Sequence, residues 1–128
     1  MNFVSSQLPP DAHAPARARR DAASLLMHQS AEVRDVALLL TSELVTNTVR
    51  HGVGEAQLDI VVESNHATIG VTDRGDGQVT ANHSRWPEGG HGLTLVDALS
   101  DRWGVEPMTG KSGKRVWFEL TWNLAESA

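Results

Sequence analysis

Residues 31–51, AEVRDVALLLTSELVTNTVRH, decide the fold of this 128-residue chain. Apolar residues recur there at helical spacing, which predicts a long helix with one face in the core. Ser30 suits the N-cap position, and Glu32 lies in the first turn, where a negative charge favours the helix dipole. Gly52 follows as a natural helix stop. We therefore expect a helix over 31–51 at the centre of the domain.

Two polar residues, Glu43 and Asn47, interrupt the apolar face of this helix. At about 100° per residue they project about 40° apart, one turn from each other. Val36 and Leu40 point in nearly the same direction. Because a buried carboxylate without a partner is strongly unfavourable, we expect a ligand or a polar group opposite this pair.

The composition narrows the range of functions. The chain is 40% hydrophobic and 21% charged, which is ordinary for a single globular domain, here expected over 1–128 with a core over about 14–122. Its formal net charge of −5 argues against a nucleic acid partner. The lack of cysteine excludes disulfides and cysteine-based metal sites. Without a long apolar span or a secretory leader pattern, we expect no membrane association and a cytoplasmic location.

The remaining segments predict an α+β fold. Alternating apolar residues predict a hairpin of two strands within 55–73, in which Asp73 points to the buried face of the sheet. The other expected elements are an edge strand near Phe3, a helix over 14–28, a short helix over 93–99, and strands over 101–107 and 114–122. We expect a two-layer α/β sandwich, with a mixed, mostly antiparallel sheet and the helices on one face.

Two glycine-containing segments carry further chemistry. Asp73-Arg74-Gly75-Asp76-Gly77 ends a strand, where a carboxylate can accept a hydrogen bond from a ligand amine while glycines allow close backbone approach. Residues 89–93, GGHGL, open a helix, whose unpaired N–H groups suit phosphate. An amide such as that of Asn47 can ligate Mg²⁺, and a carboxylate such as that of Glu43 can deprotonate a hydroxyl.

Each motif alone also has an ordinary structural interpretation. The Glu43–Asn47 pair is compatible with an exposed helix edge or a capping pair, and the segment 73–77 with a simple turn. The phosphate loop with the pattern Gly-x4-Gly-Lys-Ser/Thr is absent from the sequence. The order and spacing of all three motifs together are much more specific.

These motifs resemble those of the GHKL, or Bergerat-fold, class of ATP-binding domains. Within that class the chain is most similar to the bacterial anti-sigma factor serine/threonine kinases, over about residues 14–122. The resemblance rests on LLTSELVTNTVRHG (39–52), VTDRGDG (71–77), GGHGLTLVDALSDRWGV (89–105) and GKRVWFEL (113–120).

The resemblance implies ATP and Mg²⁺ as cofactors and assigns a role to each motif. Asp73 would bind the adenine amine, in a pocket shaped by Gly75 and Gly77. Asn47 would ligate Mg²⁺, and Glu43 would be the catalytic base for a serine or threonine hydroxyl of a partner protein.

Further nucleotide-binding positions follow from the same resemblance. Arg50 and His51 end the first motif beside the nucleotide. Residues 78–89 would form a lid, from which Arg85 would reach the γ-phosphate. The positions implied on the triphosphate side are Gly90, His91, Gly92 and Leu93.

The resemblance also implies partners: a sigma factor, an anti-sigma-factor antagonist as the phosphorylated substrate, and a possible homodimer. The sequence departs from the family pattern at two positions. Arg115 stands where a threonine often supports the adenine-binding aspartate, and His91 stands where arginine or an apolar residue is common. A non-catalytic nucleotide-binding switch is the main alternative, and the catalytic domain of a histidine kinase is a second.

Overall fold

The computed structural model describes residues 1–51, 54–74, 91–108 and 113–123. In chain order the elements are β1 (Asn2–Leu8), α1 (Ala14–Leu25), α2 (Ala31–His51), β2 (Ala56–Glu63), β3 (His66–Asp73), α3 (His91–Leu99), β4 (Arg102–Pro107) and β5 (Lys114–Thr121). None of the described helices is long and apolar enough to cross a membrane.

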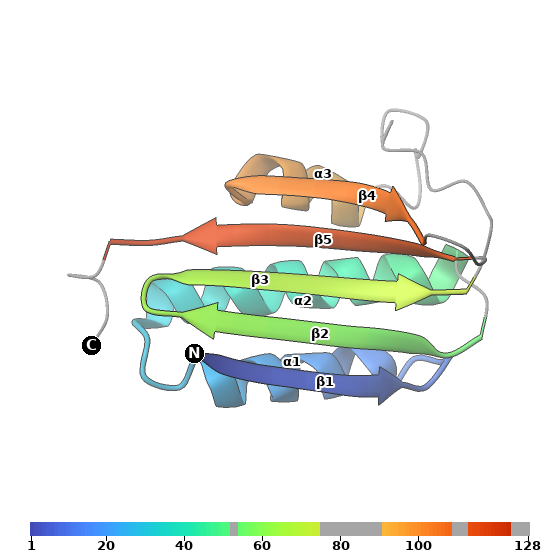
Figure 1. Ribbon diagram of the computed structural model, residues 1–128, viewed down its shortest axis with the longest axis horizontal. Coiled ribbons are helices and arrows are strands. Elements are labelled where there is room, and N and C mark those ends of the chain that lie inside the picture. Colours follow the sequence, from blue (N-terminus) through green and yellow to red (C-terminus); the bar gives the residue numbers. More distant parts are fainter. Residues whose placement is uncertain (52–53, 75–90, 109–112, 124–128) are drawn as a thin grey trace.

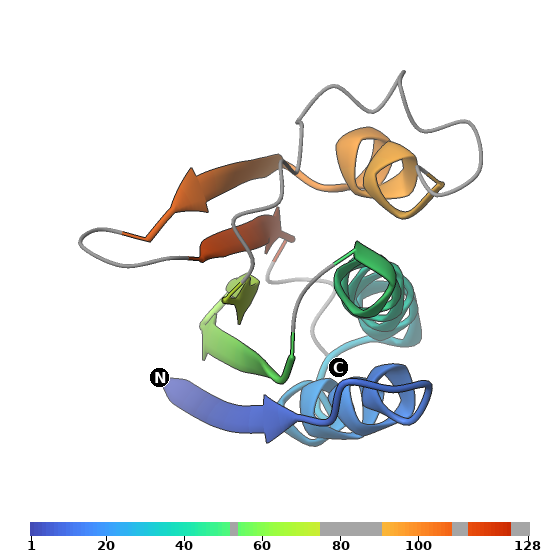
Figure 2. The same cartoon turned by 90° about the vertical axis from the view of Figure 1, so that its right-hand side faces the viewer.

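The elements form two layers, a sheet and a set of helices that covers one of its faces (Figure 1 and Figure 2). The strand order is β1-β2-β3-β5-β4, and all neighbouring pairs are antiparallel. The two-layer α+β prediction is therefore confirmed. The sheet was expected to be mixed and mostly antiparallel, and the described strands pair only in the antiparallel sense, because β5 turns back from β4 and inserts beside β3.

The helix α2 lies behind the centre of the sheet, and its burial follows the predicted period (Figure 1). Leu40, Leu44 and Val45 are fully buried, and they share the core with Ile69 of β3 and Phe118 of β5. Complete burial of one such side chain stabilises the fold by about 1.5–3 kcal/mol. The amphipathic stripe of α2 thus holds the two layers together.

The predicted start of α2 is confirmed at atomic detail. The backbone N–H of Val33 donates to Oγ of Ser30 across 3.2 Å, which is the N-cap bond expected from the sequence. The bond satisfies one of the amide groups that the first turn of a helix leaves without a partner. It therefore fixes where α2 begins and which side chains of the helix face the sheet.

The helix α1 packs beside α2 through alanines. Ala14, Ala18 and Ala22 are fully buried, and their small side chains allow a close approach of α1 to the core. The helix was expected to continue to residue 28, but it ends at Leu25, because Leu26 leaves the helical conformation while its N–H still bonds to the carbonyls of the last turn.

Candidate nucleotide site

Four chain segments converge at one end of the sheet. The C-terminal ends of α2 and β3 and the N-terminal ends of α3 and β5 lie at the right-hand side of Figure 1 and face the viewer in Figure 2. These ends carry Asn47, Asp73 and Lys114 of the described residues. The motifs that the sequence places far apart are therefore brought to a common edge.

Asp73 is the last residue of β3, and its side chain is only 3% exposed. The inward orientation predicted from strand alternation is confirmed. Its Oδ1 accepts a hydrogen bond from Nζ of Lys114 at 3.0 Å, and the Lys114 side chain is 8% exposed. The two residues are direct partners across the β3–β5 ladder. An ion pair is thus buried at the end of the sheet.

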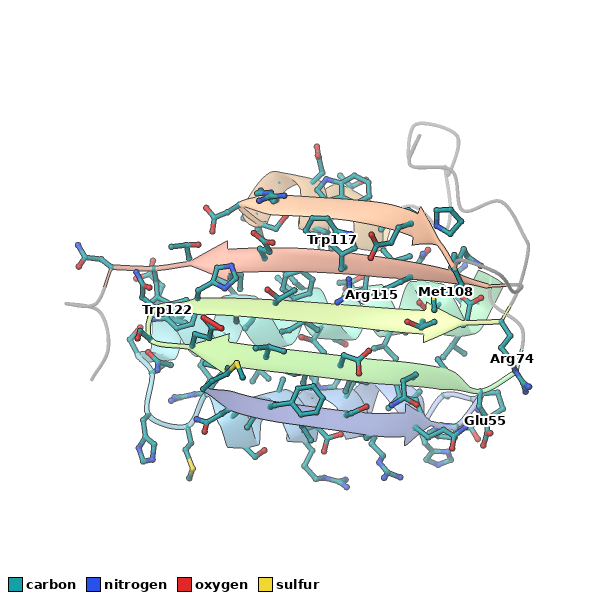
Figure 3. All side chains as sticks on the ribbon, in the orientation of Figure 1. Glu55, Arg74, Met108, Arg115, Trp117 and Trp122 are labelled. Atoms are coloured by element: carbon teal, nitrogen blue, oxygen red, sulfur yellow. The ribbon has the colours of Figure 1, made fainter. Side chains whose placement is uncertain are left out.

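Arg115, which stands at the position where the family resemblance often has a threonine that supports the aspartate, does not pair with Asp73. Arg115 pairs with Thr72 in the β3–β5 register, and its Nη1 donates to Oε1 of Glu106 at 3.2 Å. Its side chain lies on the sheet face turned away from the helices (Figure 3). Because successive strand residues point to opposite faces, the neighbour of Asp73 is Lys114, one position earlier.

Asn47 is 3% exposed and is part of the interior of the domain. Its side-chain oxygen Oδ1 is buried and makes no hydrogen bond to any residue that the structure describes. A buried amide oxygen without a donor is unfavourable, and it belongs to the class of hard oxygen ligands that Mg²⁺ prefers. The residues present therefore fit a Mg²⁺ ion held through Asn47.

Glu43 lies one turn before Asn47 and is half-buried. Within the described part of the chain its carboxylate forms no hydrogen bond or ion pair. Leu40, on the same side of α2, is fully buried. The prediction that Glu43 and Asn47 interrupt a buried stripe is thus confirmed. Asn47 lies within the core, and Glu43 lies at the border of the core, where its carboxylate can accept a hydrogen bond.

The other predicted site residues divide into those that the structure describes and those outside it. Arg50 is exposed in the last turn of α2, and Leu93 of α3 is fully buried, so its side chain belongs to the core. The helices include Gly92 and also His51 and His91, and the side chains of the two histidines lie outside the description. The remaining predicted positions, Gly75, Gly77, Arg85 and Gly90 with the segment 78–89, lie outside the described residues.

Lys114 is the site residue that the sequence interpretation missed. Finding it requires the pairing register of β3 with β5, since the two residues are 41 positions apart. The available signal was the alternation of Val116, Phe118 and Leu120, which places Lys114 on the inward face.

Comparison with known proteins supports the architecture. A likeness to the Acinetobacter baumannii histidine kinase AdeS has a TM-score of 0.52 and 13% sequence identity, and it covers 96% of this chain and 70% of that chain. At this identity the likeness shows the fold. A comparison with curated protein sequences finds no match.

A family model provides the assignment. The model of the histidine kinase-like ATPase domain matches residues 8–120, which include every described helix and the strands β2, β3, β4 and β5 up to residue 120. The matched span contains Glu43, Asn47, Asp73 and Lys114. The chain therefore belongs to the histidine kinase-like ATPase domain family.

Proposed function

We propose that this protein is an ATP- and Mg²⁺-dependent serine/threonine protein kinase of the anti-sigma-factor type. The observation that carries the proposal is the pairing, one helical turn apart, of a half-buried Glu43 with a buried Asn47 whose Oδ1 lacks a donor among the described residues. Membership of an ATPase domain family supports ATP as the nucleotide.

The purine would be read at the end of the sheet. Asp73 is the last residue of β3, at the end of the sheet where α2 also ends and α3 begins. Its carboxylate is held in a fixed position by Lys114. A carboxylate is an acceptor only, so it complements an exocyclic amine of a base. Burial strengthens such a hydrogen bond, because competing water is excluded.

The phosphates would lie toward α2. Asn47 would hold Mg²⁺ through Oδ1, and the ion would neutralise charge on the phosphate oxygens. Glu43 would accept the proton of a serine or threonine hydroxyl on the partner protein. The hydroxyl oxygen would form a bond to the γ-phosphorus, the bond from that phosphorus to the β–γ bridging oxygen would break, and ADP would leave.

The partners in this proposal are a sigma factor and an anti-sigma-factor antagonist, with the antagonist as phosphoryl acceptor. These partners come from the family resemblance of the motifs, as does a possible homodimer. The alternative is a nucleotide-binding switch that docks partners without transferring phosphate. Phosphoryl transfer to a histidine is the other alternative, and it is tested because the family model describes a histidine kinase-like domain.

A transfer assay separates these possibilities. The full chain is incubated with γ-labelled ATP, Mg²⁺ and candidate antagonist proteins, and the labelled product is treated with acid and with alkali. Phosphoserine and phosphothreonine survive acid, whereas phosphohistidine is hydrolysed by it. The proposal predicts an acid-stable label on the antagonist; an acid-labile label, or bound ATP without any transfer, contradicts it.

Two substitutions complete the test. Glu43→Gln is expected to abolish transfer while ATP binding remains, and Asp73→Asn is expected to weaken ATP binding itself. Glu32→Gln, an exposed change in the first turn of the same helix, is the matched control and is expected to leave both unchanged. Transfer that persists in Glu43→Gln would show that the carboxylate is not the base.

A further inference from the structure

We propose that Lys114 is a specificity-determining residue that reads the purine base together with Asp73. The inference rests on the proposed nucleotide site and extends it. In this arrangement Asp73 accepts from an amine of the base, and the Lys114 ammonium donates to the ring nitrogen next to that amine. The pair therefore selects a base edge on which a donor stands beside an acceptor.

The first support is the placement of the ion pair. Asp73 and Lys114 are cross-strand partners at the ends of β3 and β5, on the edge of the sheet where the site residues gather. The preceding pair on the same face is Val71 and Val116, which are 1% and 2% exposed. The ion pair thus lies next to buried apolar side chains and is not an exposed surface salt bridge.

The second support is the hydrogen-bonding capacity of the two groups. A carboxylate offers about four acceptor positions on two oxygens, and an ammonium has three donors. The contact of 3.0 Å between Nζ and Oδ1 uses one donor and one acceptor position. The carboxylate acceptor of Asp73 and the ammonium donor of Lys114 therefore lie side by side, within hydrogen-bond distance of each other.

The third support is the fixed polarity of lysine. A hydroxyl can donate or accept, but an ammonium only donates. Adenine presents its N6 amine beside the N1 acceptor, and this order matches an acceptor on Asp73 beside a donor on Lys114. A base that lacks the ring acceptor would bury the ammonium against a C–H group, and that loss is penalised strongly in a water-excluded site.

The test uses 1-deaza-ATP, in which the N1 acceptor is replaced by C–H while the amine and the phosphates are kept. Binding of ATP and of 1-deaza-ATP to the full chain is measured by calorimetry in the presence of Mg²⁺. A hydrogen bond from a charged donor predicts that the wild-type protein prefers ATP by about 10- to 100-fold. In Lys114→Met the preference is expected to fall to within about twofold, since the donor is gone.

Further variants keep the test decisive. Lys114→Gln retains an N–H donor of similar reach and is expected to keep a preference for ATP, which covers the case in which Lys114→Met does not fold. Arg115→Met changes the next residue, on the outer face of the same strand, and is expected to behave as wild type.

The outcomes separate the two proposals. If the wild-type protein binds ATP but shows no preference over 1-deaza-ATP, or if Lys114→Met keeps the full preference, the role of Lys114 is overturned and the nucleotide site stands. If the wild-type protein binds neither nucleotide, the proposed function itself fails.

Discussion

The ring of Trp117 occupies the space that a side chain at Gly104 would take. A Cβ atom at residue 104 would lie 2.9 Å from Cζ2 of Trp117 and 3.1 Å from its Cε2 and Nε1. The two residues are partners across the β4–β5 ladder, and Trp117 lies on the outer face of the sheet (Figure 3). The Arg102 guanidinium lies 5.8 Å from the centre of the Trp117 ring. Glycine at this position lets the indole lie against the backbone of the edge strand.

We predict that Gly104→Ala destabilises the protein. A distance of 2.9 Å is too short for a carbon–carbon contact, so the rigid indole must move, at a cost of about 1–3 kcal/mol. Urea denaturation measures the loss. In a Trp117→Ala background the same glycine change is expected to cost much less, and equal losses in the two backgrounds would show that the ring is not the obstacle.

The buried ion pair gives a second prediction, on stability alone. Lys114→Met removes the ammonium from a carboxylate that is 3% exposed, which is expected to cost about 3–5 kcal/mol. The double variant Asp73→Asn/Lys114→Met is expected to be more stable than Lys114→Met, because no charge is then left in the core. Additive losses in the two single variants would contradict a direct coupling.

A third prediction concerns the amide of Asn47. With its Oδ1 as the magnesium ligand, Asn47→Ala is expected to bind ATP equally with Mg²⁺ or with EDTA, whereas the wild-type protein binds more tightly with Mg²⁺. Thermal unfolding serves as the control for folding. Thr48→Ala changes a neighbouring residue whose hydroxyl is already bonded to the Leu44 carbonyl at 3.0 Å, and it is expected to keep the magnesium effect.

The start of α1 provides a pH prediction. The backbone N–H of His13 donates to Oδ1 of Asp11 at 2.8 Å, and this bond, aided by the His13 side chain, lowers the pKa of the Asp11 carboxyl below its ordinary value. A lowered pKa in the folded state means that the carboxylate contributes stability above its unfolded pKa, and this contribution is lost as the pH falls through the folded value. An NMR titration is expected to show a lower midpoint for Asp11 than for the same residue in the unfolded chain; a midpoint that is equal or higher would contradict the bond.

Much of the fold is readable from periodicity. The bounds of α2, the cap at Ser30, the hairpin of β2 and β3, and the inward orientation of Asp73 all follow from local spacing, because each depends on residues close in sequence. The same spacing singled out Glu43 and Asn47, since polar residues on an apolar stripe stand out against their neighbours.

What could not be predicted depends on contacts between distant segments. The insertion of β5 between β3 and β4 sets which residue faces Asp73, and a shift of one position exchanges Lys114 for Arg115. The sequence alone does not determine the pairing register of β3 with β5. The sequence predicted a mostly antiparallel sheet, and whether every pair is antiparallel is decided only when the strands meet.

The position of β5 also has a consequence for synthesis of the protein. Among the described strands β5 leaves the ribosome last, yet it occupies an inner position of the sheet beside β3. Asp73 emerges 41 residues before Lys114 and stays without this partner until β5 docks. A nascent chain that ends before β5 therefore has an open edge at β3. Under the proposed function, nucleotide recognition would begin only after β5 has docked, because the pair of Asp73 and Lys114 is incomplete until then.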